Sequence, residues 1–128
     1  MELSKILYVE DEEDICSIAQ IALEDLGGFT VKFCHSGTDA LRDALAFGPD
    51  LILLDVMMPD MDGPTTLTEL QKISGLENVP IIFMTAKIQT NEVNEFRSMK
   101  NVIDVVAKPF DPMTLAETLR NSWNKHSG

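Results

Sequence analysis

The chain has 128 residues, 45% of them apolar, which is enough for one domain with a single hydrophobic core. Its formal charge of -11 disfavours direct binding to nucleic acid, because affinity for a phosphate backbone comes largely from lysine and arginine. Two cysteines are too few for a disulfide framework, and no apolar run approaches the ~20 residues that cross a bilayer. We therefore expect a cytoplasmic protein without membrane contact, whose partners are proteins or small cations.

Short aliphatic or β-branched runs alternate with longer segments of helical periodicity along the whole chain. The runs with the length and composition of strands are 5–9, 29–34, 51–55, 80–85 and 101–106. Strands that alternate with helices form parallel sheets covered on both faces. We therefore predict an α/β fold, a doubly wound five-stranded parallel sheet flanked by five helices.

The helical segments follow the strands in order. The first carries an apolar stripe before two glycines end it, made of Ile15, Ile18, Ala19, Ala22 and Leu26. Ser36 is the predicted N-cap of the second helix, with Asp39 three residues on. Pro64 and Pro112 suit the first positions of the third and fifth helices, where a missing N–H group costs nothing.

The later helices differ in how strongly their sequences predict a buried face. Inward side chains are expected in the third and fifth helices at Leu67, Leu70, Ile73, Leu115, Leu119 and Trp123. The fourth helix, from about residue 90 to 99, has the weakest pattern, with an apolar stripe limited to Val93, Phe96 and Met99. It is therefore the least firmly predicted element.

In parallel sheets the functional residues gather at the carboxyl ends of the strands. The polar residues at or just after the predicted strand ends are Glu10, Asp11, Asp55, Thr85 and Lys108. We expect these side chains to meet at one edge of the sheet.

The first strand runs into five consecutive acids, residues 10–14. Those at 12–14 fall in the predicted first helical turn, where free N–H groups stabilise carboxylates. Glu10 and Asp11 instead face Asp55, and three carboxylates at one edge repel each other by several kcal/mol at an effective dielectric of about 20. A divalent cation removes this conflict, and Mg²⁺ prefers hard oxygen ligands. We predict a magnesium site.

Four motifs carry a resemblance to a known family: "YVED", "LILLDVMMPDMDG", "FMTAK" and "VAKPFDP". Together they resemble the receiver domain of two-component response regulators, in the order of that family and over essentially the whole chain. The resemblance implies that residues 1–128 form a single receiver domain. It also implies the flavodoxin-like strand order 2-1-3-4-5.

The resemblance assigns a role to each candidate residue. Asp55 matches the phosphoacceptor, Thr85 the hydroxyl that bonds a phosphoryl oxygen, and Lys108 the ammonium placed against Asp55 or its phosphoryl group. The implied magnesium ligands are Asp11 directly, Glu10 through water, Asp55, and the backbone carbonyl of Met57. A cis peptide before Pro109 is expected to turn Lys108 into the pocket.

Residues near the site add further expectations. Gly63 is expected to free the backbone of the loop after Asp55, and Asp60 and Asp62 are interpreted as solvated turn residues rather than ligands. Met57 and Lys87 occupy positions that in this family influence the access of water to the acyl phosphate.

Two features depart from the family pattern. Val105 stands where most receivers have an aromatic ring that rotates on phosphorylation. The stretch "SMKNVID" replaces the Gly-Ala pair common before the last strand, which leaves the end of the fourth helix undefined.

The resemblance implies a switch that is activated when Asp55 accepts a phosphoryl group from a sensor histidine kinase or a histidine phosphotransfer protein. Its catalysis would be limited to its own phosphorylation and dephosphorylation, so it is not otherwise an enzyme. The fourth helix, fifth strand and fifth helix would present the changed surface to a downstream protein partner. The chain is too short for an output domain as well, and is either a stand-alone receiver or a piece of a larger regulator.

Two other classes of protein share part of this pattern. A degenerate receiver would act as a phosphorylation-independent binding module, but such proteins typically lose the acids or the lysine. A flavin carrier or an aspartyl phosphatase would share the doubly wound fold. The first would need a phosphate loop that an acidic run opposes, and the second would need an aspartate where Met57 stands.

Overall fold

The computed structural model describes residues 2–86 and 90–127 of the chain. The strands are β1 (Lys5–Val9), β2 (Thr30–Cys34), β3 (Leu51–Asp55), β4 (Ile81–Thr85) and β5 (Val102–Ala107). The helices are α1 (Glu13–Gln20), α2 (Gly37–Phe47), α3 (Gly63–Gln71), α4 (Thr90–Ser98) and α5 (Leu115–Ser127), with a π-helical segment, η1 (Ile21–Asp25), after α1. Every strand begins and ends within one residue of its prediction, since short apolar runs bounded by polar residues have little freedom to shift.

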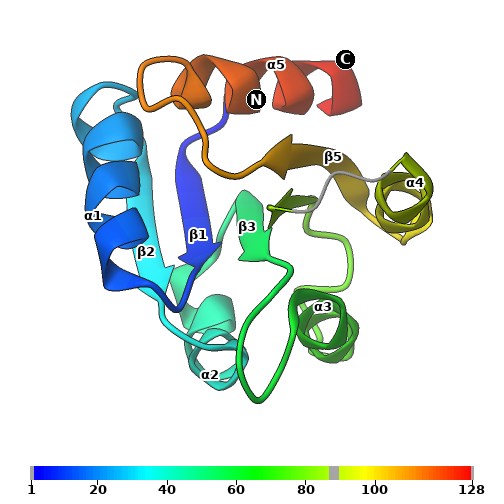
Figure 1. The fold of residues 1–128 in the computed structure, drawn as a ribbon. Helices are drawn as coiled ribbons and strands as arrows, with labels where there is room; N and C mark the ends of the chain where they lie inside the picture. The colour runs from blue at the N-terminus through cyan, green and yellow to red at the C-terminus, as the bar shows by residue number, and fades with distance from the viewer. Residues whose placement is uncertain (1, 87–89, 128) are drawn as a thin grey trace.

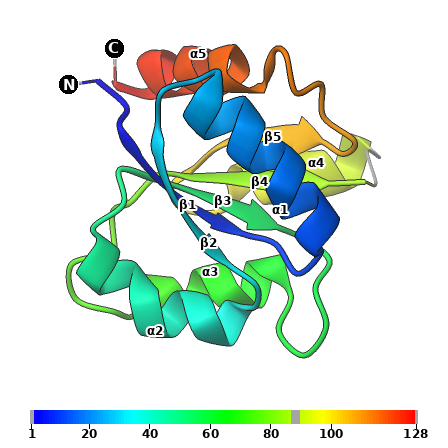
Figure 2. The same ribbon diagram turned by 90° about the vertical axis from the view of Figure 1, so that its left-hand side faces the viewer.

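The strands form one parallel sheet in the order β2-β1-β3-β4-β5. Helices α1 and α5 cover one face, while α2 and α3 cover the other (Figures 1 and 2). The central strand β3 is buried at every residue, as expected for a strand covered on both sides. The predicted α/β fold and strand order are confirmed.

The buried face of α1 differs from the predicted stripe. Ala19 and Ala22 are buried as expected, but Ile18 and Leu26 are about half exposed, at 47% and 54%. The small side chain of Cys16 packs inward instead, together with Leu23. Small residues let α1 lie close to the sheet, and the wider turn of η1, in which the Leu26 N–H donates to the Ile21 carbonyl at 3.0 Å, turns Leu26 outward.

The N-termini of α1 and α2 lie close to their predicted positions. Glu12 occupies the N-cap position of α1 rather than its first turn, which holds Glu13 and Asp14. The Ser36 side chain caps α2 as predicted, accepting a hydrogen bond from the Asp39 N–H at 3.0 Å. Ser36 therefore satisfies one of the free N–H groups in the first turn of α2, whereas the Glu12 side chain forms no such capping hydrogen bond in α1.

Helix α5 starts later than predicted. Pro112 lies in a turn before the helix, because Asp111 accepts hydrogen bonds through its carbonyl from the N–H groups of Thr114 and Leu115, and through its side chain from Met113. Pro64 does stand in the first turn of α3. The expected inward residues of both helices are buried, except for Ile73, which follows α3 and is half-buried.

Helix α4 is the most weakly anchored helix, as its sequence pattern suggested. None of its side chains from 91 to 98 is buried, and its main apolar contact is the Phe96 ring, 5.2 Å from the Phe83 ring on β4. Val105, in the position where an aromatic residue was expected, is half-buried and pairs with Phe83 across the sheet. Lys87 lies outside the described residues.

Candidate functional site

The acids after β1 and β3 meet at the carboxyl edge of the sheet. Because Val9 pairs with Leu54, Glu10 follows β1 at the level where Asp55 ends β3. The side chains of Glu10, Asp11 and Asp55 each offer a carboxylate oxygen, and these oxygens lie within 4.8 Å of one another. The structure therefore brings together the acids that the sequence placed at this edge.

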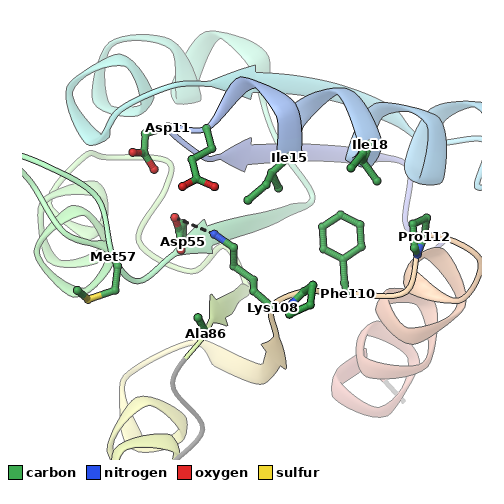
Figure 3. Close-up of a pocket in the computed structure, with 11 residues that line it drawn as sticks. Asp11, Ile15, Ile18, Asp55, Met57, Ala86, Lys108, Phe110 and Pro112 are labelled. Atoms are coloured by element: carbon green, nitrogen blue, oxygen red, sulfur yellow. Dashed lines mark ion pairs between the residues drawn. The ribbon is translucent and has the colours of Figure 1, made fainter.

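Lys108 inserts its ammonium between two of these carboxylates. Its Nζ lies 2.8 Å from Glu10 Oε1. The same Nζ lies 3.2 Å from Asp55 Oδ2, the ion pair drawn as a dashed line in Figure 3. Its backbone N–H donates to the Thr85 carbonyl at 2.9 Å, which ties the loop after β5 to the end of β4. The peptide bond between Lys108 and Pro109 is cis, as predicted.

Burial and mutual charge shift the pKa values of this cluster. Burial of the fully enclosed Glu10 carboxyl raises its pKa to about 7, against the Lys108 hydrogen bond that lowers it and with the help of the Asp55 charge. Burial lowers the pKa of Lys108, but the hydrogen bond and charge from Glu10 and the charge of Asp55 outweigh it, so the net shift is upward. The Lys108 ammonium therefore stays protonated at neutral pH, whereas burial opposes ionisation of Glu10.

Thr85 ends β4 at the same edge and is 2% exposed. Its strand neighbour Met84 pairs with Asp55, so Thr85 lies one residue further toward the loops. The hydroxyl-bearing residue is thus positioned beside the acid cluster by sheet register alone.

The loop after β3 passes very close to Asp55. A Cβ atom on Gly63 would lie 2.4 Å from the Asp55 carbonyl oxygen and 2.9 Å from Val56 Cα, so a side chain there meets backbone that cannot move aside. Asp60 is exposed, as interpreted from the sequence. Asp62 is exposed too, but it has a structural role that the sequence reading missed, because its side chain caps α3 through the Thr65 N–H at 2.9 Å.

We expect Gly63→Ala to lower the free energy of unfolding by about 1–3 kcal/mol, the usual cost of forcing extra atoms into a packed site. Urea unfolding measures this change. Thr65→Ala, at an exposed neighbour, is the control and should stay close to the wild-type value. Equal stability of the Gly63→Ala protein and the wild type would contradict the close approach.

A pocket of about 480 Å³ opens beside Asp55 and Lys108. Figure 3 shows Ile15 and Ile18 of α1 facing Phe110 and Pro112 of the loop before α5 across this space. Met57, 61% exposed, lines the pocket next to Asp55. Sequence periodicity had assigned Ile15 and Ile18 to the core, so this apolar wall was not predicted.

Two side chains that were not predicted to lie at the site contact the backbone carbonyl of Glu10. The Cys16 thiol donates to the Glu10 carbonyl at 3.5 Å, and Nδ1 of His35 lies 3.3 Å from the same oxygen. Burial raises the pKa of Cys16 to about 11, so it acts as a neutral donor. No spacing in the sequence connects these residues, which lie on different elements.

Tyr8 is a further buried group near the acids. It is fully enclosed on β1, stacks on Phe33 with 5.7 Å between ring centroids, and its hydroxyl has no hydrogen-bond partner within the described part of the chain. Burial, with the nearby charges of Glu10 and Asp55, raises the pKa of this phenol. It is therefore a neutral core residue.

The fold and the position of the site define a class of protein. The sheet is doubly wound in the order 2-1-3-4-5, and the acids lie between β1 and β3, where successive strands change from one side of β1 to the other. This arrangement defines a flavodoxin-like domain with its site at the topological switch point. Residues 6–120 match the family model of the response regulator receiver domain. The chain belongs to this family, whose members are signalling domains of two-component systems rather than enzymes acting on separate substrates.

Individual relatives agree with this assignment. The uncharacterized transcriptional regulatory protein YclJ of Bacillus subtilis is 34% identical over 117 residues, which cover 91% of this chain and 49% of that protein. The transcriptional regulatory protein DltR of Streptococcus agalactiae is 38% identical over 117 residues, covering 91% of this chain and 50% of that protein. This chain spans about half the length of these curated relatives.

Solved structures show the same architecture. The chemotaxis response regulator CheY4 of Vibrio cholerae superposes with a TM-score of 0.84 at 28% identity, covering 94% of this chain and 98% of that one. Receiver domains of this family interact with histidine kinases and downstream effectors. Among the helices of the described ranges, none is long and apolar enough to cross a membrane.

Proposed function

We propose that residues 1–128 form one receiver domain that switches state when Asp55 accepts a phosphoryl group. The observation that carries this proposal is the convergence of three carboxylates and the Lys108 ammonium at one sheet edge, beside an accessible pocket. The donor is a phosphohistidine of a sensor histidine kinase or of a histidine phosphotransfer protein. A carboxylate oxygen of Asp55 bonds to phosphorus as the bond from phosphorus to the imidazole nitrogen breaks.

The acid cluster fits a magnesium ion. Its donor set consists of carboxylate oxygens close enough to share one cation, and hard oxygen ligands are what Mg²⁺ prefers. Asp11 and Asp55 would hold the ion directly, Glu10 through water, and the Met57 backbone carbonyl would complete the protein ligands. When bound, the ion supplies positive charge that offsets the charge of the phosphoryl oxygens.

The chain's own residues perform the remaining work by position. Lys108, held at 3.2 Å from Asp55, follows the phosphoryl group and neutralises part of its charge. The Thr85 hydroxyl donates to a phosphoryl oxygen once the group has arrived. Met57 shields the acyl phosphate from water on the exposed side of the pocket. The protein thereby promotes only its own phosphorylation and dephosphorylation.

The proposed output surface is formed by α4, β5 and α5. Because Val105 has no ring to rotate, the shift must come from Thr85 closing on the phosphoryl group and from α4, whose side chains from 91 to 98 are not buried. This surface serves a downstream protein partner in the cytoplasm. Direct binding of this chain to nucleic acid is opposed by its charge of -11.

Phosphorylation by acetyl phosphate, followed by intact mass, tests the proposal. We expect a mass increase of one phosphoryl group that requires Mg²⁺ and is lost in Asp11→Ala, because this variant lacks a direct ligand of the ion. Asp14→Ala removes an exposed acid of the same run and should behave as wild type. Normal phosphorylation of Asp11→Ala in the presence of a chelator would refute the metal site.

A further inference from the structure

The backbone carbonyl of Glu10 lies where the pairing of β1 with β2 ends. Val9 and Cys34 are the last pair of this ladder, and the Glu10 N–H donates to the Cys34 carbonyl at 2.9 Å. Two side chains from different elements then reach the Glu10 carbonyl oxygen. The Cys16 thiol of α1 lies 3.5 Å from it, and Nδ1 of His35, the residue after β2, lies 3.3 Å from it. We call these two contacts the Glu10 brace.

The geometry of the brace selects one tautomer of His35. A carbonyl oxygen has two lone pairs, so it can accept from the thiol and from the imidazole at once. The Cys16 Sγ and His35 Nδ1 atoms are 3.8 Å apart, further from each other than each is from the oxygen. If Nδ1 carried no hydrogen, its lone pair would face a carbonyl lone pair at 3.3 Å, which is repulsive. The contact therefore requires a hydrogen on Nδ1.

The brace acts on a residue whose carboxylate is also held on both oxygens. Lys108 Nζ lies 2.8 Å from Glu10 Oε1, and the Glu12 N–H donates to Oε2 at 3.3 Å. The Glu10 carbonyl and the Asp11 N–H belong to one planar peptide unit. Fixing the carbonyl oxygen therefore fixes the plane from which Asp11 begins.

Holding this peptide opposes the repulsion within the acid cluster. Carboxylate oxygens of Glu10, Asp11 and Asp55 lie within 4.8 Å of one another, so their charges push the segment after β1 away from β3. A segment that relaxed in this way would have to be ordered again when a cation binds. With the brace, this ordering takes place during folding, and a preorganised site binds its ligand more tightly.

We propose that His35 is a positioning residue of the magnesium site, acting by donation from Nδ1 to the Glu10 carbonyl beside Cys16. In this role it neither holds the ion nor touches the phosphoryl group. The inference rests on the proposed function, because that function includes the ion. Solvent limits the size of the effect. Cys16 and His35 line a hollow of about 270 Å³ beside α1, from which water can replace part of a lost hydrogen bond.

Imidazole ¹⁵N NMR of the wild type tests the brace without any substitution or metal. The spectrum is recorded at about pH 8, where neutral imidazole predominates. We expect His35 to show a hydrogen on Nδ1 and none on Nε2. His126, exposed near the end of α5, is the reference and should show the mixture of tautomers found in solvent. A His35 ring with its hydrogen on Nε2, or with the same mixture as His126, would overturn the proposal.

Magnesium affinity tests the effect of the brace on the ion. We titrate the ¹⁵N-labelled protein with Mg²⁺ and follow the backbone amide shifts of Asp11 and Met57. His35→Leu is expected to raise the Kd for Mg²⁺ about twofold to tenfold, the range for one lost hydrogen bond. His35→Asn should recover most of this loss, because its NH₂ nitrogen is as many bonds from Cβ as Nδ1 is. Equal weakening by both variants, or an unchanged Kd in His35→Leu, would overturn the proposal.

Two further variants test whether the donors share one acceptor. His126→Leu removes the other histidine of the chain and should leave the Kd unchanged. Cys16→Ala removes the second donor of the brace. Each single loss leaves the carbonyl one partner, so removing both donors should raise the Kd by more than the product of the two single factors. Factors that simply multiply, or equal weakening by His126→Leu and His35→Leu, would overturn the shared brace.

Phosphorylation separates this inference from the proposed function. His35→Leu should need more Mg²⁺ for half-maximal phosphorylation of Asp55, in proportion to its Kd, with a smaller change in the rate at saturation. A wild type that does not bind Mg²⁺ would refute the magnesium site of the proposed function and this inference with it. Normal Mg²⁺ binding by the wild type and by every variant would refute this inference alone.

Discussion

Asp55→Asn is expected to abolish phosphorylation by acetyl phosphate, so that the mass increase of the wild type disappears completely. The carboxylate oxygen is the nucleophile, and the neutral amide that replaces it attacks phosphorus far more weakly. Asparagine has nearly the same shape as aspartate, so it should fit the position of the Asp55 side chain, which is 3% exposed, and the variant should remain folded. Intact mass spectrometry of the two proteins measures the difference.

The chemistry of the product adds a second criterion. A phosphoryl group on Asp55 is an acyl phosphate, and treatment of the wild type with hydroxylamine or base should remove it. Asp60→Asn is the matched control, because Asp60 is an exposed acid of the neighbouring loop, and its φ of 68° is tolerated by asparagine. A base-stable phosphate that maps to serine or threonine would exclude Asp55 as the acceptor.

The stability of the metal-free protein is expected to depend on the Glu10 carboxyl. Its pKa is about 7 in the folded state and 4.5 for the unperturbed group. Between these values the folded state binds more protons than the unfolded state, so the contribution of Glu10 to stability falls as pH rises from 4.5 to about 7. Over that window the loss is about 3 kcal/mol.

A comparison with Glu10→Gln isolates this effect, because glutamine does not titrate while other carboxyls do so in both proteins. Urea unfolding at pH 5 and pH 7.5 in chelator should show the variant gaining stability relative to the wild type at the higher pH. Mg²⁺ should stabilise the wild type at pH 7.5, since it favours the ionised cluster. Glu12→Gln, at an exposed acid, is the control. Parallel pH profiles for Glu10→Gln and the wild type would contradict the burial argument.

The order of the elements and the location of the site could be predicted from the sequence. Apolar runs such as 51–55 have one favourable environment, a buried strand, and polar residues at their ends must then lie at the sheet edge. The position of Glu10, Asp55 and Lys108 at or just after the strand ends therefore predicts that they lie together. The Ser36 cap of α2 could also be predicted, because it bonds an N–H group three residues away, whereas the equivalent Asp62 cap of α3 was interpreted as a turn residue.

Tertiary structure alone decided which side chains face the core and which face the pocket. Ile15 and Ile18 match a helical stripe, but the close approach of α1 to the sheet selects Cys16 and Ala19 for burial and leaves the larger isoleucines at the pocket wall. The contact of His35 with the Glu10 carbonyl and that of Ser122 with Asp104 likewise join residues on different elements that are distant in sequence. Local sequence determines a strand or a cap because its interactions span a few residues, whereas packing depends on shapes supplied by other elements.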